Sequence, residues 1–294
     1  MTKEEYSVRW RSTTSKTIGL LKTIYASKHG AVGFLILLIY LFMAAFGPLI
    51  RPLDTTPKPG QMYLPPSIEY PLGTDNQGRD TLSFIVNGTF DVLYISLVAS
   101  MISVILAVLV GSVSGFKGGV VDSVLMYISD IILNIPQFPL MAVLSGLMRL
   151  TDVSLAMLMG VLSWPSLAKA IRSQVLSLKE RDFIEAARLL DLGTRHIVFT
   201  ELMPNLMPYI AVSFALAMTY SIYNYVGLVF LGFVPFRAYN WGVMINHAWV
   251  LGAIYNRDSI LWILSPIIAI VGLEVGVIMF SRGLELAFNP RLRK

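Results

Sequence analysis

Residues 182–193 read DFIEAARLLDLG, and they form the centre of a polar stretch, 169–204, that separates two long apolar segments. Lys, Glu, Arg, Ala and Leu are good helix formers, so the sequence predicts a helix up to Leu190. Gly193 supplies a stop, and Thr194 can cap a second, shorter helix. The pattern therefore predicts a helix-turn-helix placed at a membrane surface.

The first arm of this motif carries Glu185 beside Ala186 and Ala187, so a second protein can approach closely and contact a single charge. Pro204, nineteen positions after the glutamate, begins the next apolar run. This combination resembles the cytoplasmic loop of ABC importer permeases, which docks into a cleft on the ATPase subunit. That family usually has glycine six positions after the glutamate, where this chain has Asp191. The resemblance implies a role in ATPase coupling, and the alternative is an ordinary amphipathic surface helix.

The composition is that of a membrane protein. Of 294 residues, 55% are hydrophobic and 14% are charged, and the mean hydropathy is +0.66. A soluble domain carries about 25% charged residues. The net charge is +5, but the basic residues are not clustered as in a nucleic-acid-binding surface. We therefore expect a multi-pass protein of the cell membrane, in contact with the lipid bilayer and not with nucleic acid.

Six apolar runs are as long as a membrane span, about 20 residues, or nearly so. Neighbouring helices must cover the prolines that interrupt the third run. Gly111 and Gly115 in the second run permit close helix packing. The sequence predicts an all-α polytopic membrane protein with six transmembrane helices, at 30–50, 92–115, 123–148, 153–168, 209–234 and 260–280.

The distribution of Lys and Arg predicts the orientation of these spans. With the amino terminus inside, 17 of the 23 basic residues lie on the cytoplasmic side and 6 outside. Cytoplasmic loops carry the excess of Lys and Arg, so both termini and the coupling loop 169–204 are expected in the cytoplasm. The loop 235–259 contains Trp241, Trp249 and Tyr255, which suit an interfacial helix. The expected segments are a cytoplasmic tail 1–29, a first transmembrane helix 30–50, an extracytoplasmic loop 51–88, a permease core 89–285 and a cytoplasmic tail 286–294.

The predicted extracytoplasmic loop holds a second motif. From the residues alone it is a turn followed by a capped helix, since Asp75 and Asp80 can both cap. It also resembles the peptide-importer branch of the ABC permeases, as does the ending at 289–293. The motif consists of Gly73, Thr74, Asp75, Gly78, Arg79 and Asp80.

The resemblance covers roughly residues 30–294, nearly the whole chain. It implies a permease of the type I ABC importer fold. It also implies a heteromeric assembly with a second permease subunit, two ATPase subunits and an extracytoplasmic solute-binding protein. Peptides are the commonest cargo of this branch, and oligosaccharides and nickel complexes are carried by close relatives.

The chain lacks the motif of a P-loop ATPase, since none of its nine lysines follows a glycine. We therefore expect it not to be an enzyme and to bind no cofactor or metal, with ATP and Mg²⁺ held by the partner ATPase subunits. The alternative function is a self-sufficient ion-coupled secondary transporter with Asp130 and Glu274 as intramembrane ligands. Such a transporter would need matching broken helices in both halves of the chain.

Five side chains are candidates for the transport pathway. Ser213, Tyr220 and Asn224 share one face of the fifth span, where they either line the pathway or form hydrogen bonds between helices. Glu274 lies in mid-span, where facing lipid would cost about 2.5–3.5 kcal/mol. It is expected to contact the paired permease or to favour cargo that carries an ammonium group. Asp130 is either a pathway residue or, like Asp122, a packing or boundary residue.

Overall fold

The computed structural model describes residues 27–148, 151–234 and 237–288. Within these ranges every regular element is a helix, which confirms the predicted all-α class. The basic tail 1–26 and the motif at 289–293 lie outside the described residues.

Five of the described helices are long and apolar enough to cross a membrane, and a sixth span results if a bent pair counts as one. The bent pair is α4, Gly119–Asn134, with α5, Gln137–Leu147, and its two helices meet at 73°. The break falls where the sequence has its prolines. The other spanning helices are α2 (Lys28–Ile50), α3 (Thr81–Lys117), α6 (Asp152–Lys179), α9 (Met203–Phe230) and α11 (Ile260–Phe288).

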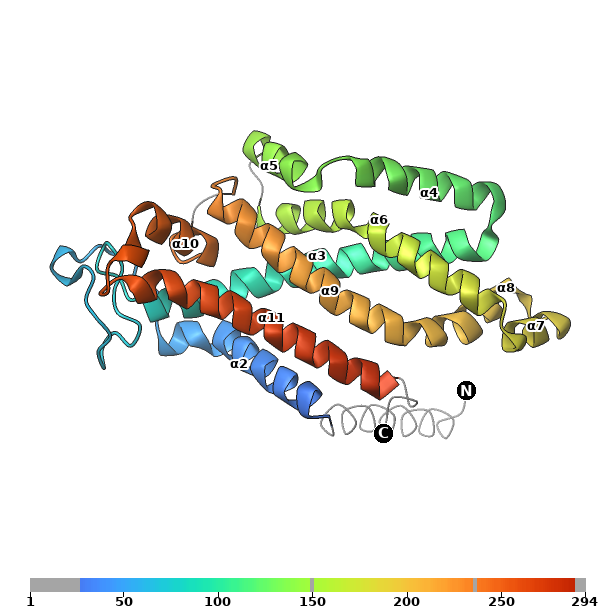
Figure 1. Ribbon diagram of the computed structural model, residues 1–294, viewed down its shortest axis with the longest axis horizontal. Helices are drawn as coiled ribbons and strands as arrows, with labels where there is room; N and C mark the ends of the chain where they lie inside the picture. Colours follow the sequence, from blue (N-terminus) through green and yellow to red (C-terminus); the bar gives the residue numbers. More distant parts are fainter. Residues whose placement is uncertain (1–26, 149–150, 235–236, 289–294) are drawn as a thin grey trace, which may run out of the picture.

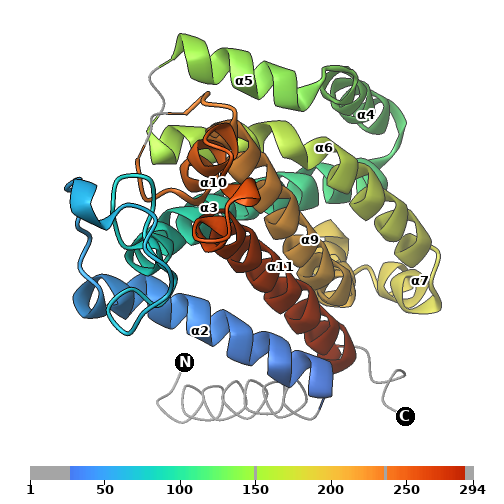
Figure 2. The same cartoon turned by 60° about the vertical axis from the view of Figure 1, so that its left-hand side comes forward.

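Helix α3 lies at the centre of the bundle, and its most extensive contact is with α6 (Figures 1 and 2). Two glycines make this contact close. A Cβ atom on Gly111 would lie 2.5 Å from the carbonyl oxygen of Ala168, and one on Gly115 would lie 2.9 Å from the Cβ of Val175. The predicted glycine packing is therefore confirmed. On the other side of the bundle, α2 packs along α11.

The broken span stands at the edge of the bundle (Figure 2). Helix α4 buries only Ser129, so apolar packing within this chain contributes little to its position. Ion pairs to α6 hold it instead: Asp122 contacts Arg172 at 2.5 Å, and Asp130 pairs with Lys169. The exposed apolar residues of α4 are free to face lipid or another subunit.

The two predicted loops lie at opposite ends of the molecule (Figure 1). The loop before α3 and helix α10 (Trp241–Val250) occupy one end, and α7 (Asp182–Leu189) with α8 (Gly193–His196) occupy the other. This separation suits loops on opposite sides of a membrane.

Two helix boundaries at these ends differ from those expected. Helix α3 begins at Thr81 because the Asp80 carboxylate accepts from the Leu82 N–H, so residues 81–88 are helical and the loop is 51–80. Helix α9 ends at Phe230, four residues before the expected 234. Of the three aromatic residues expected to suit an interfacial helix, Trp249 and Tyr255 are exposed. The Trp241 side chain is fully buried, and its ring N–H donates to the carbonyl of Ile85 at 3.0 Å.

Candidate functional site

Helix α7 is packed onto the ends of the two spans that flank it. It buries Ile184 and Ala187 in an apolar cluster with residues of α6 and α9. Glu185 and Ala186 are exposed, as expected for a docking surface. Ala187 was expected there as well, and that expectation was wrong because it lies on the buried face of the helix.

The turn after α7 is built on Asp191. Its φ of 50° is in the left-handed region, and the N–H of the next residue, Leu192, donates to the carbonyl of Ala187 at 3.2 Å. The helix ends at Leu189, within one residue of the predicted end at Leu190, and Gly193 is also left-handed, with a φ of 73°. The cap expected from Thr194 is absent, because α8 begins one residue earlier and no side chain caps it.

Pro204, which was expected to open the next apolar run, lies inside a helical segment that starts before it. A π-helical turn, Ile197–Leu202, joins α8 to α9, and Pro204 is the second residue of α9 within a continuous helical segment, 193–230. Proline lacks an N–H and its ring crowds the carbonyl four residues earlier. A wide turn directly before the proline accommodates both effects.

An apolar surface surrounds the coupling turn. The side chains of Leu189 and Leu190 are 82% and 70% exposed, and Phe199 is 65% exposed. Together with Glu185 and Ala186 we call this the coupling surface. Large exposed apolar patches mark sites that bind other proteins.

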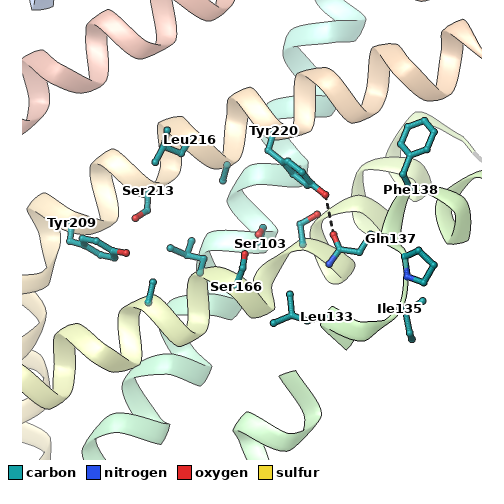
Figure 3. Close-up of a pocket in the computed structure, with 15 residues that line it drawn as sticks. Ser103, Leu133, Ile135, Gln137, Phe138, Ser166, Tyr209, Ser213, Leu216 and Tyr220 are labelled. Atoms are coloured by element: carbon teal, nitrogen blue, oxygen red, sulfur yellow. Dashed lines mark hydrogen bonds between the residues drawn. The ribbon is translucent and has the colours of Figure 1, made fainter. Parts of the chain in front are cut away.

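A cleft of about 650 Å³ lies between α5, α6 and α9, against α3 (Figure 3). Ser213 and Tyr220, both predicted pathway candidates, line it. Asn224 does not: it is buried beside the cleft, and its amide donates to the carbonyl of Tyr220 at 2.8 Å. The other polar lining residues are Ser103, Gln137, Ser163, Ser166 and Tyr209.

Gln137 is the lining residue that sequence reasoning missed. It is the first residue of α5, directly after the Ile135-Pro136 break. Its amide nitrogen donates to the carbonyl of Leu162 on α6 at 2.8 Å, and its amide oxygen accepts from the Tyr220 hydroxyl at 3.1 Å (Figure 3). The sequence did contain a signal for this residue: Gln137 is polar and stands directly after a proline break inside an apolar run.

The two acidic candidates lie away from the cleft lining. Asp130 is on α4, in its ion pair with Lys169. Glu274 on α11 is only 5% exposed, its carboxyl faces the Tyr223 hydroxyl of α9, and its Oε1 has no hydrogen-bond partner among the described residues.

The motif in the loop 51–80 forms a compact turn in front of α3. Asp75 and Arg79 make a buried ion pair, with 2.6 Å between Nε and Oδ2. The Thr74 hydroxyl accepts from the Leu64 N–H and donates to the carbonyl of Gln61. Both glycines, Gly73 and Gly78, have left-handed φ angles and sit against backbone carbonyls of the same loop. The conformation of the loop accounts for this residue pattern.

A second ion-pair group at this end was not visible in the sequence. Arg237, in the loop after α9, contacts Asp91 of α3 at 3.0 Å and Asp152 of α6 at 2.8 Å. The three side chains come from distant parts of the chain. They tie the ends of two spans to the loop that leads into α10.

Membrane-length helices, a polar cleft among the spans and an exposed apolar surface at one end define a membrane transport subunit that binds another protein. Comparison with known protein families identifies the particular family. Residues 107–294 match the model of the binding-protein-dependent transport system inner membrane component family, and the chain belongs to this family.

Relatives cover most of the chain. The oligopeptide transport system permease protein OppC of Bacillus subtilis is 29% identical over 92% of this chain and 88% of its own length. The dipeptide transport system permease protein DppC of the same organism is 30% identical over 80% of this chain and 74% of its own length. A di/tripeptide transport system permease protein DppC of Pseudomonas aeruginosa is 29% identical over 92% of this chain and 90% of its own length.

The resemblance seen in the sequence is thereby confirmed. The chain is the membrane permease component of a binding-protein-dependent ABC transport system, and ATP hydrolysis belongs to a separate subunit. The system implies a solute-binding protein and an ATPase as partners. The alternative of a self-sufficient ion-coupled transporter is set aside.

Proposed function

We propose that the chain is one of two different permease subunits of a peptide importer, with its amino terminus and coupling surface in the cytoplasm. Peptide cargo is supported by the relatives, which are oligopeptide, dipeptide and di/tripeptide transport system permeases. A second permease is supported by α4, which buries one residue within this chain and leaves apolar side chains exposed.

One structural observation supports the coupling mechanism. The two helices that flank the coupling stretch, α6 and α9, are the same two that form the walls of the cleft. Ile184 and Ala187 anchor α7 in the cluster formed by the ends of these helices. A displacement of α7 by the ATPase would therefore move α6 and α9 directly, and the cleft between them would change shape.

The chemistry of the coupling surface suits a protein partner. Its leucines would pack against apolar residues of the ATPase, and Glu185 would form a charge-assisted hydrogen bond with a basic residue there. Glu185 lies in the first half of α7, where the helix dipole favours a carboxylate.

The test is ATP hydrolysis by the reconstituted complex. Glu185→Lys removes one partner of an interfacial charge pair and adds repulsion, which costs at least about 2–5 kcal/mol of docking free energy. We expect the variant to lose binding-protein-stimulated hydrolysis and uptake. Asp258→Lys, the same charge change on an exposed residue at the other end, should leave both unchanged. Normal uptake by Glu185→Lys would show that the coupling assignment is wrong.

A further inference from the structure

The cleft contains hydrogen-bonding groups but no formal charge. Its described lining residues include four serines, two tyrosines and one glutamine, and no Asp, Glu, Lys, Arg or His. The remaining lining residues are apolar or aromatic. A ligand of this cleft would therefore be recognised through neutral hydrogen-bond donors and acceptors.

Two of the serine hydroxyls have unused hydrogen-bonding capacity. Ser103 and Ser213 are 3% and 6% exposed, line the cleft, and have no hydrogen-bond partner among the described residues. Neither oxygen is among the buried side-chain atoms without a partner, so both are accessible from the cleft, where water or a ligand can pair with them. These two hydroxyls, on α3 and α9, therefore indicate that a polar ligand or water completes the site.

Gln137 shows which chemical group the cleft can hold. Its side chain is an amide, and both ends are bound: the N–H by the carbonyl of Leu162 and the C=O by the hydroxyl of Tyr220. A peptide group offers the same donor and acceptor. Tyr220 belongs to α9 (Figure 3) and Leu162 to α6, and these two helices form walls of the cleft.

We propose that the cleft is a binding site for the backbone amides of the cargo, and that the Gln137 carboxamide occupies it until a cargo amide displaces it. This inference rests on the proposed function as a peptide permease. The exchange replaces one amide by another at Leu162 and Tyr220, so few hydrogen bonds are lost as the cargo enters. The site would recognise the backbone and would not select among charged side chains.

The absence of native cysteines allows a direct test. Ser213→Cys is introduced, and the detergent-solubilised complex of permeases and ATPases, without binding protein, is treated with a thiol reagent. Trialanine should slow the reaction at this cysteine, and trialanine with N-methylated peptide bonds should not, because it lacks the internal N–H donors. A cysteine at Ser123, which is exposed on α4, is the control and should react equally in all samples.

The displacement step is tested with Gln137→Leu in the same cysteine background. Without the competing amide, the trialanine concentration that gives half-protection should fall roughly two- to twelvefold, the equivalent of one net hydrogen bond. Adding Tyr220→Phe to Gln137→Leu removes a partner that only the cargo amide then uses, so the half-protecting concentration should rise again. If Gln137→Leu does not assemble, Gln137→Met provides the same test with a side chain of similar length.

The outcomes separate this inference from the proposed function. Uptake of peptide into proteoliposomes, measured with the complete complex including the binding protein, tests the permease itself. Normal uptake with no protection of the cysteine, or equal protection by both peptides, would overturn the amide site alone. An unchanged half-protecting concentration in Gln137→Leu would overturn displacement. A complex that takes up no peptide would overturn the peptide function and the amide site together.

Discussion

Asp191 holds a backbone conformation that usually requires glycine. Its φ of 50° lies in the left-handed region, which costs most residues roughly 1–2 kcal/mol, although Asp and Asn tolerate it better. The resembling permeases usually have glycine here. In this chain the aspartate itself takes the left-handed conformation at the turn.

Replacing this residue should change stability in a predictable order. Asp191→Gly relieves the strain and should leave the complex as stable or more stable by up to about 1 kcal/mol, whereas Asp191→Val should cost more than 1 kcal/mol. Asp191→Asn is the matched control and should be neutral. Thermal unfolding of the purified complex measures the order, and an Asp191→Val complex as stable as the parent would contradict the left-handed turn.

At the scale of elements, the contact between α3 and α6 depends on a missing side chain. A Cβ at Gly111 would approach the carbonyl oxygen of Ala168 to 2.5 Å, and backbone cannot easily move away. Gly111→Val should separate the helices and destabilise the protein by roughly 1–3 kcal/mol.

The control for this prediction is Gly146→Val. Gly146 is also helical, and a Cβ there meets nothing within 4 Å. Folded yield and melting temperature in detergent would be compared. Equal losses for the two variants would show that helix propensity, and not the close approach, sets the effect.

A histidine of α10, His247, lies in the electrostatic field of the loop 51–80 and predicts a pH dependence. Burial lowers the pKa of His247 below its usual 6.5, and the nearby Arg79 lowers it further, while Asp75 acts in the opposite direction. The folded state therefore disfavours the charged imidazole. Its contribution to stability is complete above about pH 6.5 and is lost as the pH falls toward the lowered pKa.

We expect the loop 51–80 to become more sensitive to protease between pH 7.5 and 5.5. His247→Gln should remove this change, and His196→Gln, at the opposite end, should not. Digestion rates of the purified complex measure the effect. An identical pH profile in the parent and His247→Gln would exclude this histidine as its source.

At the scale of the whole molecule, the two ends should face opposite sides of the membrane. Cysteines replacing Ile68, which is fully exposed, and Tyr255, which is 91% exposed, should react with an impermeant thiol reagent in intact cells. A cysteine replacing Thr194, which is exposed at the other end and outside the coupling surface, should react only after the cells are opened. The reverse labelling would overturn both the orientation and the coupling assignment.

The apolar runs were sufficient to predict the spans, because membrane length and lack of charge are properties of local sequence. Helix ends were less predictable. Helix α6 continues through Lys169 and Arg172 because aspartates on α4 pair with them, and the sequence does not show which segments meet. Gln137 was missed for the same reason: its partners lie 25 and 83 residues away.

The exposed leucines of the coupling surface have a consequence for the life of the subunit in the cell. Before the ATPase binds, Leu189 and Leu190 face water, and surfaces of this kind attract chaperones, proteases and other unfolded chains. The residues that bind the ATPase would then also mark a permease that has no ATPase bound. Synthesis of the permease without its ATPase would give a short-lived protein, and quality control would keep the numbers of the two subunits in balance.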